Sequence, residues 1–261
     1  MSAPETVRFT VENGIATITL ARPEKLNALD AGMIAALARI VDRLDHDGSI
    51  RVAILTGEGK AFCAGGDIAA WGALPSLEMG QIWVRDGHRV FDHLARLKMP
   101  LIAAINGHAL GGGLEIAATA DIRIGEEQGK YGLPETGIGM VPGWSGTQRI
   151  VQRFGANVVR RLALTGEIVT AARAMELGLI DEVVPKGTVL ERAMALANQI
   201  RTKSPVATTL TKQLINAAEG DDVAATLEIL AGALITTTAD RREGVAAFLE
   251  KRPANFEDLD R

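Results

Sequence analysis

Three consecutive glycines at residues 111–113, followed by Glu115, form the stretch of this sequence best suited to chemistry. An apolar run precedes them and a run of small residues follows, which predicts a strand, a glycine loop and the start of a helix. Glycine has no Cβ, so other groups can approach the backbone closely and amide groups stay uncovered. At a helix N-terminus such amides favour an anion or a developing oxyanion. Glu115 is then either a functional carboxylate or a favourable charge at the positive end of the helix dipole.

A second segment of the same kind lies earlier in the chain. Residues 52–55 are an apolar strand candidate, and the loop at residues 61–67 contains Gly66 just before a helix start. A helical segment at residues 78–98 separates the two units, an order that implies parallel strands joined by right-handed crossovers. Loops at the same ends of neighbouring parallel strands meet at one site. We therefore expect the amides of Gly66 and Gly112 to face one oxygen.

The remaining pattern predicts the elements that position these loops. Residues 131–143 are too rich in glycine and proline for regular structure and are expected to form an ordered functional loop. Past residue 189 the strand pattern disappears, so we divide the chain into a core domain with the active site, residues 1–201, and a C-terminal helical region, residues 202–261. Apolar spacing predicts strands at 7–10, 14–20, 101–105, 121–124 and 179–184, and helices at 28–44, 148–164, 170–177, 189–201, 205–219, 221–233 and 239–250.

Composition narrows the class of protein. Hydrophobic residues make up 47% of the chain but aromatic residues only 4%, so the core is expected to be aliphatic. The net charge is -4 and the charges are interspersed, so we expect no nucleic acid partner. No apolar run approaches the roughly 18 residues of a membrane helix, and the N-terminus has no signal segment. A lone cysteine, Cys63, excludes an internal disulfide and predicts a reducing, cytoplasmic location.

Three motifs in order resemble those of a known superfamily. Residues 64–68 read Ala-Gly-Gly-Asp-Ile, residues 106–115 read Asn-Gly-His-Ala-Leu-Gly-Gly-Gly-Leu-Glu, and residues 133–135 read Leu-Pro-Glu. Together they resemble the crotonase superfamily, closest to enoyl-CoA hydratase. The resemblance spans residues 22–252. It implies an α/β fold, a spiral of ββα units with a C-terminal helical trimerisation region, and a homo-oligomer that is a trimer or a dimer of trimers.

The resemblance also implies a mechanism. In the family, amides matching Gly66 and Gly112 form the oxyanion hole for the thioester carbonyl of an acyl-CoA, and the two catalytic glutamates match Glu115 and Glu135. Adding water to a trans-2-enoyl thioester places negative charge on that oxygen, which fixed NH donors stabilise. Two carboxyl groups around one water can remove its proton and protonate Cα if one stays protonated near neutral pH. By resemblance Glu115 activates water, Glu135 protonates Cα, and the Gly143 amide helps to place the water.

Contacts to the substrate follow by the same resemblance. Lys25 and Lys251 match family positions near the CoA phosphates, the second from a neighbouring subunit, although either is also explained as a solvated surface lysine. The carbonyl of Ala64 matches the group that meets the adenine amine. We expect no metal and no separate cofactor, since coenzyme A is part of the substrate. The predicted substrate-binding set also contains Gly66, Asp67, Ile68, Gly112 and Trp144.

Trp144 departs from the usual family pattern, because many hydratases carry a small residue after the glycine matching Gly143. A rigid indole beside the expected water either limits the acyl pocket or packs into the core. The shape of the acyl pocket also depends on how Trp71, residues 74–79 and Trp83 lie, and this shape sets the acyl chain length that the protein accepts.

The same residues bear on other possible functions. Many enoyl-CoA isomerases keep only the glutamate matching Glu135, so Glu115 favours a hydratase, with isomerase as the main alternative. A non-catalytic acyl-CoA-binding protein would be favoured by the loss of a glutamate, and neither is lost. Residues 143–146, Gly-Trp-Ser-Gly, lack the last glycine of a nucleophile elbow and follow no strand, so a serine hydrolase is not expected. His108 lacks partners at metal-ligand spacing and is interpreted as structural.

Overall fold

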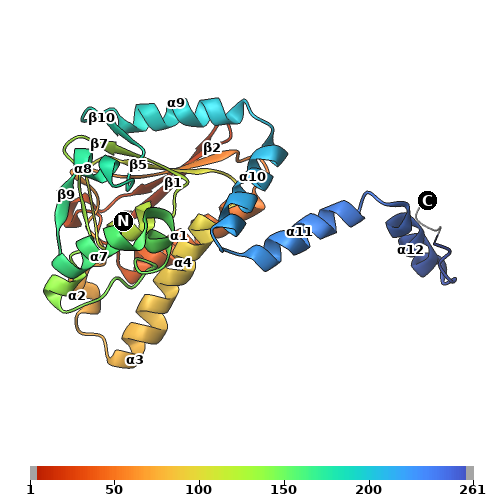
Figure 1. Cartoon of the computed structure of the whole chain (residues 1–261), viewed down its shortest axis with the longest axis horizontal. Helices are drawn as coiled ribbons and strands as arrows, with labels where there is room; N and C mark the ends of the chain where they lie inside the picture. Colours follow the sequence, from red (N-terminus) through yellow and green to blue (C-terminus); the bar gives the residue numbers. More distant parts are fainter. Residues whose placement is uncertain (1–4, 257–261) are drawn as a thin grey trace. The chain divides into compact units, whose positions relative to one another are not determined.

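The computed structural model describes residues 5–256 and divides the chain into two compact units, one ending at Lys212 and one beginning at Gln213 (Figure 1). The first unit contains a six-stranded sheet in the order β1-β2-β3-β5-β7-β10. Only β1 and β2 pair antiparallel, and every later neighbour pairs parallel. The strands are β1 Val7–Glu12, β2 Ile15–Leu20, β3 Val52–Gly57, β5 Leu101–Ile105, β7 Ile122–Glu126 and β10 Glu182–Val184.

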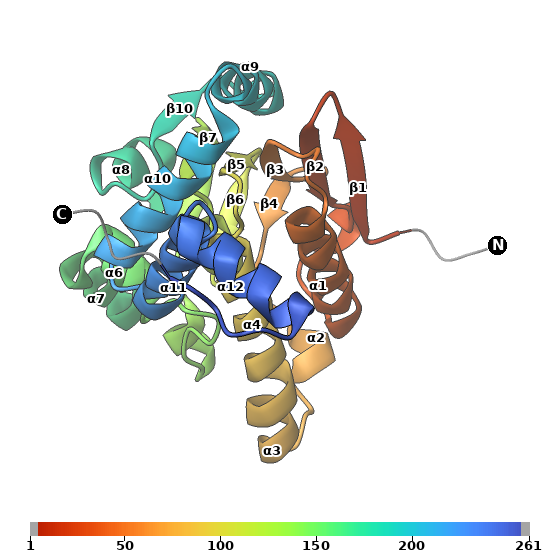
Figure 2. The ribbon, with the colours of Figure 1, turned by 90° about the vertical axis from the view of Figure 1, so that its right-hand side faces the viewer.

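This sheet is covered on both faces, as its apolar strands predict. Ile54 and Ile102 pack with helix α9 (Val189–Arg201), whereas their neighbours Leu55 and Ala103 face the larger core on the other side. Figure 2 shows α9 and helix α1 (Ala31–His46) on opposite sides of the sheet. The parallel pairing of β3 with β5 confirms that these two crossover strands are neighbours, which places the loops that follow them at one edge.

A second sheet, of four short strands, lies where we expected loops. Its order is β4-β6-β8-β9, with β4, β6 and β8 parallel and β9 antiparallel to β8. Strands of three residues are too short to show an alternation of apolar and polar side chains, so no pattern predicts them. The prediction that residues 131–143 hold no regular structure was wrong at both β8 and the 3₁₀ helix η3 (Glu135–Ile138). The strands are β4 Ala61–Cys63, β6 His108–Leu110, β8 Lys130–Gly132 and β9 Ile168–Thr170.

The helices of the first unit differ from the prediction at two places. The expected helix at residues 78–98 is a π-helix, η2 (Met79–Val84), that continues into α4 (Arg85–Ala95). The expected helix at residues 148–164 is two helices, because Gly155 interrupts it at φ +87°. The remaining elements are η1 Pro23–Lys25, α2 Ile68–Trp71, α3 Ser76–Glu78, α5 Gly112–Ala117, α6 Arg149–Phe154, α7 Ala156–Thr165 and α8 Ala171–Glu176.

The division between the units falls inside helix α10 (Pro205–Ala218), later than the predicted boundary at residues 201 and 202. Lys212 explains why the first unit extends this far. Its ammonium is 6% exposed and donates to the carbonyl of Met99 at 3.1 Å and to the carboxylate of Asp121 at 2.8 Å. The start of α10 therefore belongs to the first unit.

The second unit contains two further helices, α11 (Val223–Ile235) and α12 (Ala239–Glu250). Large apolar side chains on it are open to solvent, among them Leu227 at 62%, Leu234 at 69% and Phe248 at 82%. In the described part of the chain no single helix is long and apolar enough to span a membrane, while α11 and α12, bent by 78°, meet the length and composition test only as a pair.

Candidate active site

The two glycine loops meet at the end of the small sheet. Strands β4 and β6 run parallel, with Cys63 opposite Ala109, so the loops after them leave at the same edge. A Cβ added to Gly65 would lie 3.3 Å from the backbone nitrogen of Gly112, and one added to Gly113 would lie 1.9 Å from the carbonyl oxygen of Cys63. Only glycines permit this approach. The structure thus brings the segments of Gly66 and Gly112 together, as the strand order predicted.

A cavity of about 400 Å³ opens beside these loops. It contains both glutamates and both glycine segments, so the residues proposed for chemistry share one space. Eight of the predicted site residues line it: Ala64, Gly66, Ile68, Gly112, Glu115, Glu135, Gly143 and Trp144.

Glu115 is a buried carboxyl group held by two amides. It lies in α5 and is 3% exposed. Its Oε1 accepts hydrogen bonds from the backbone N–H groups of Trp144 and Gly146, both at 2.7 Å. Burial, and secondarily the charge of Glu135, raise the pKa of Glu115 to about 8, against the lowering effect of the two amides and of Arg149. This carboxyl can therefore exchange a proton near neutral pH, as acid–base catalysis requires.

Glu135 enters the same cavity from the 3₁₀ helix η3. It lies against the loop of Gly111, where an added Cβ would be 2.8 Å from its Oε1. Its Oε2 is buried without a hydrogen-bond partner in the described part of the chain, and burial raises its pKa. A buried carboxyl oxygen without a partner is suited to bind a water or substrate atom that enters the cavity.

The protonation of Glu115 predicts how stability changes with pH. In the folded chain the carboxyl keeps its proton up to about pH 8, whereas an ordinary glutamate releases it near 4.5. Between these values the folded state binds more protons than the unfolded state, so the free energy of unfolding falls as pH rises. Below both values the carboxyl is neutral in both states and carries no cost. The free energy of unfolding of Glu115→Gln, relative to that of wild type, should therefore rise by at least about 1 kcal/mol as the pH increases from about 4.5 to about 8.

Urea unfolding of both proteins across this range measures the difference. Glu191→Gln, a change at an exposed carboxylate of α9, is the matched control and should give no such trend. A stability difference between wild type and Glu115→Gln that stays constant with pH would contradict the raised pKa.

Trp144 both lines the cavity and packs into the core, so the two explanations offered for it hold together. Its side chain is 4% exposed, and its ring lies 5.0 Å from that of Trp83 and 5.2 Å from that of Phe91. Two glycines make room for the indole: a Cβ would lie 2.2 Å from it on Gly87 and 2.8 Å from it on Gly112. The indole therefore supports the backbone of the proposed oxyanion hole.

Three predicted substrate contacts lie outside the cavity lining. The Asp67 carboxylate is bound to Arg22 at 2.7 Å and caps α2 by accepting from the N–H of Ala69 at 3.0 Å, which fixes the chain just after the first glycine loop. Lys25 is exposed in the first unit, and Lys251 belongs to the second unit. The predicted contacts of these residues with substrate stay predictions.

Sequence reasoning did not assign several residues that shape the site. The amide of Gly146 holds Glu115, yet the segment around it was considered only as a nucleophile motif. The glycine at position 146 was the one sign in the sequence that the backbone is closely approached there. In the structure a Cβ on Gly146 would lie 2.5 Å from Pro142 and 2.7 Å from Glu115, so only glycine fits. Trp71, Met79 and Trp83, which were expected from the sequence to shape the acyl pocket, do line the cavity, and the lining residues without an assigned role include Val84, Met140 and Val141.

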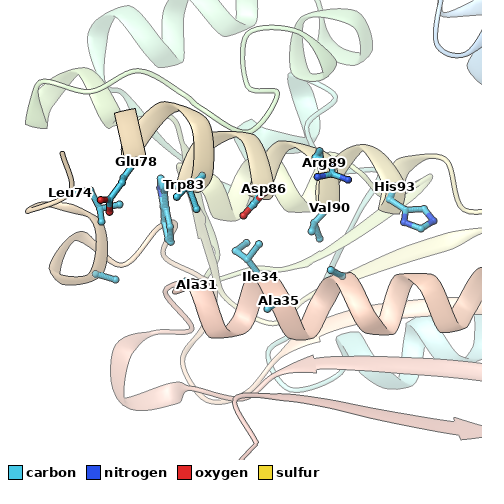
Figure 3. A pocket seen from close by; sticks show the side chains of 13 residues that line it. Ala31, Ile34, Ala35, Leu74, Glu78, Trp83, Asp86, Arg89, Val90 and His93 are labelled. Atoms are coloured by element: carbon cyan, nitrogen blue, oxygen red, sulfur yellow. The ribbon is translucent and has the colours of Figure 1, made fainter. Parts of the chain in front are cut away.

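A second hollow of about 460 Å³ lies between α1 and α4 (Figure 3). Its floor is apolar, with Ile34 and Val90, and charged groups such as Asp86 and Arg89 stand along it. Among the described lining residues, Trp83 alone is shared with the catalytic cavity. Trp83 therefore borders both spaces.

The described residues offer neither a metal site nor a reactive thiol. Within residues 5–256 no group of three His, Cys, Asp or Glu side chains is placed to hold a metal ion. Cys63 is fully buried, and burial raises the pKa of its thiol to about 12. A buried thiol that keeps its proton at neutral pH is poorly suited to act as a nucleophile.

Comparison with known proteins shows the family of this chain. The family model described as enoyl-CoA hydratase/isomerase matches residues 10–259, and the chain belongs to this family. It is 36% identical to a short-chain-enoyl-CoA hydratase of Clostridium acetobutylicum, over 92% of this chain and 93% of that protein. It is 35% identical to a crotonyl-CoA hydratase of Syntrophomonas wolfei, over 97% and 98%. A crystal structure of an enoyl-CoA hydratase from Bacillus anthracis is similar with a TM-score of 0.81 and 33% identity, over 98% of this chain and 100% of that one.

Proposed function

We propose that this protein is an enoyl-CoA hydratase, which adds water syn across the double bond of a trans-2-enoyl-CoA to give a 3-hydroxyacyl-CoA. The observation that carries the proposal is one cavity in which Glu115 and Glu135 both face the meeting point of two glycine loops. The hydratase names of the relatives support the same reaction.

In the proposed mechanism the thioester oxygen lies against the amides of Gly66 and Gly112. Charge that develops there during addition is stabilised by these fixed donors. Glu115 takes the proton of water, Glu135 delivers a proton to Cα, and the Gly143 amide helps to place the water. The raised pKa of Glu115, about 8, supports this exchange, since that carboxyl can hold or release a proton near neutral pH. Burial raises the pKa of Glu135 as well.

The experiment is hydration of crotonyl-CoA by the purified protein, followed by loss of the enoyl-thioester absorbance and identification of 3-hydroxybutyryl-CoA. A parallel assay with a 3-enoyl-CoA tests the alternative, isomerisation within the same family. A clear excess of hydration is expected because two glutamates are present. Isomerisation without hydration would reject the proposal, and binding without turnover would favour a non-catalytic acyl-CoA-binding protein.

The proposed substrate carries a short acyl group. Three indoles, those of Trp71, Trp83 and Trp144, line the cavity and leave about 400 Å³ for both the acyl part and the reacting atoms. We further propose that Ala64 and Lys25, with Lys251 from a neighbouring subunit, contact the CoA moiety, which is part of the substrate. A reducing, cytoplasmic setting completes the proposal and suits a chain with one buried thiol.

We propose a homo-oligomer, a trimer or a dimer of trimers, assembled through the second unit. Leu227 and Leu234 on α11 are 62% and 69% exposed, and burying such side chains between subunits would stabilise an assembly. Sedimentation at micromolar concentration should show a trimer or hexamer. The double variant Leu227→Glu with Leu234→Glu should sediment as a smaller assembly. Glu228→Lys on the same helix changes a charge only and should leave it intact. A monomeric wild type would contradict the proposal.

A further inference from the structure

The loop at residues 144–146, here called the Glu115 loop, holds the buried carboxyl with two amides in a strained conformation. The N–H groups of Trp144 and Gly146 both donate to Oε1 of Glu115 at 2.7 Å. Ser145, between them, has φ +82°, a region that residues with a side chain seldom adopt. Such a conformation persists only where the surroundings hold it.

Ser145 is held at both its backbone and its side chain. Its carbonyl accepts from the N–H groups of Gln148 at 3.2 Å and Ile150 at 3.3 Å, which ties the loop to the start of α6. Its hydroxyl oxygen lies 3.2 Å from Nδ1 of His88 on α4, and the residue is 5% exposed. The hydroxyl thus connects the Glu115 loop to a second helix.

His88 is itself oriented by charged neighbours. Its Nε2 lies 3.3 Å from a carboxylate oxygen of Asp92, one turn along α4, and Asp92 also pairs with Arg149 of α6. When Nε2–H donates to Asp92, Nδ1 remains an acceptor for the hydroxyl of Ser145. Ser145 is absent from the described lining of the catalytic cavity, so this Ser-His-Asp array has no path to a thioester carbonyl.

We propose that His88 is a positioning residue: through the hydroxyl of Ser145 it keeps the amides of Trp144 and Gly146 directed at Glu115. The inference deepens the proposed hydratase function and rests on it. Helix α4 then holds the loop at two points, since the indole of Trp144 also packs against Gly87 and donates to the carbonyl of Trp83 at 3.3 Å.

Loss of the link has a defined consequence for Glu115. Amide donors stabilise its ionised form, so weaker donation raises its pKa further. The other charged groups that act on this carboxyl are Glu135 and Arg149, and neither is altered by a change at Ser145. Less of the base is then ionised at a given pH, so kcat should fall and the acidic limb of the pH profile should move to higher pH.

Four variants test the inference in crotonyl-CoA hydration. Ser145→Ala and His88→Ala should each lower kcat about tenfold, leave KM within about twofold, and move the acidic limb up by at least about half a pH unit. His88→Asn keeps a polar group near the Nδ1 position and should restore part of kcat. Arg89→Ala, at an exposed neighbour on α4, is the control and should behave as wild type. An unmoved acidic limb in Ser145→Ala and His88→Ala would overturn the inference.

Ser145→Gly separates the hydroxyl bond from backbone strain. Glycine adopts positive φ freely, so this variant removes the hydroxyl together with Cβ and leaves no side-chain strain in the backbone. It should reproduce the shift of Ser145→Ala if the link to His88 positions the amides. Wild-type kinetics in Ser145→Gly, with a defect in Ser145→Ala, would assign the effect to strain and overturn the role of His88.

A stability measurement tests the same point without turnover. Urea unfolding of Ser145→Ala and of Ser145→Ala with Glu115→Gln, across pH, gives the midpoint at which Glu115 ionises in the folded state. We expect this midpoint to lie above that of the corresponding pair with Ser145 intact, and an unchanged midpoint would overturn the inference. If wild type fails to hydrate crotonyl-CoA, the proposed function fails, while this midpoint still decides whether the loop is positioned through Ser145.

Discussion

Glu115→Gln and Glu135→Gln are each expected to slow the hydration of crotonyl-CoA by at least about a hundredfold, because glutamine keeps the shape of the side chain but neither takes nor gives a proton. Acyl-CoA binding should survive in both variants, since the glycine loops and the cavity walls are unchanged. The measurement is kcat and KM for crotonyl-CoA, with a binding assay for a saturated acyl-CoA.

The structure supplies a control for this pair. Glu127→Gln changes a glutamate adjoining β7, outside the described lining of the catalytic cavity, and should leave turnover near that of wild type. Near-normal turnover in Glu115→Gln or Glu135→Gln would reject the two-glutamate mechanism and reopen the assignment of the base.

Trp144→Ala should cost about 3 to 5 kcal/mol of stability, the usual loss for truncation of a buried tryptophan. The indole fills the space between Gly87 and Gly112 and touches the rings of Trp83 and Phe91, so its removal leaves a cavity beside the oxyanion loop. The same change should raise kcat/KM for longer enoyl-CoAs relative to crotonyl-CoA, because burying each added methylene in the new space contributes about 0.8 kcal/mol to substrate binding.

Two readouts separate the parts of this prediction. A melting temperature unchanged from wild type would contradict the core role of Trp144, and an unchanged ratio of long-chain to short-chain rates would contradict its role as a cavity wall. Trp144→Phe keeps most of the ring and should show a smaller loss of stability and a smaller change in the ratio.

The convergence of the glycine loops could be predicted from sequence because its causes are local. Apolar runs at β3 and β5 imply parallel strands, and glycines after them imply close backbone approach. Both features appear in the sequence letters themselves. The long-range result, Gly65 against Gly112, follows from the crossover rule without knowledge of any side-chain contact.

The small sheet and the support of Glu115 could not be predicted in the same way. Strands of three residues carry no period, and their pairing is decided by the sheet beside which they form. The amides of Trp144 and Gly146 find Glu115 only because α4 receives the indole at Gly87 and the hydroxyl of Ser145 at its next residue. Such a contact depends on packing between elements far apart in the sequence, which no local pattern encodes.

The buried thiol of Cys63 allows local opening of the fold to be followed by thiol alkylation. It is the only cysteine in the sequence, and its sulfur accepts a hydrogen bond from the N–H of Gly65, in the first glycine loop, at 3.4 Å. An alkylating reagent can reach this fully buried sulfur only when the fold opens around it. The rate of alkylation therefore measures how often the fold opens beside the first glycine loop, without a label that would disturb the packing.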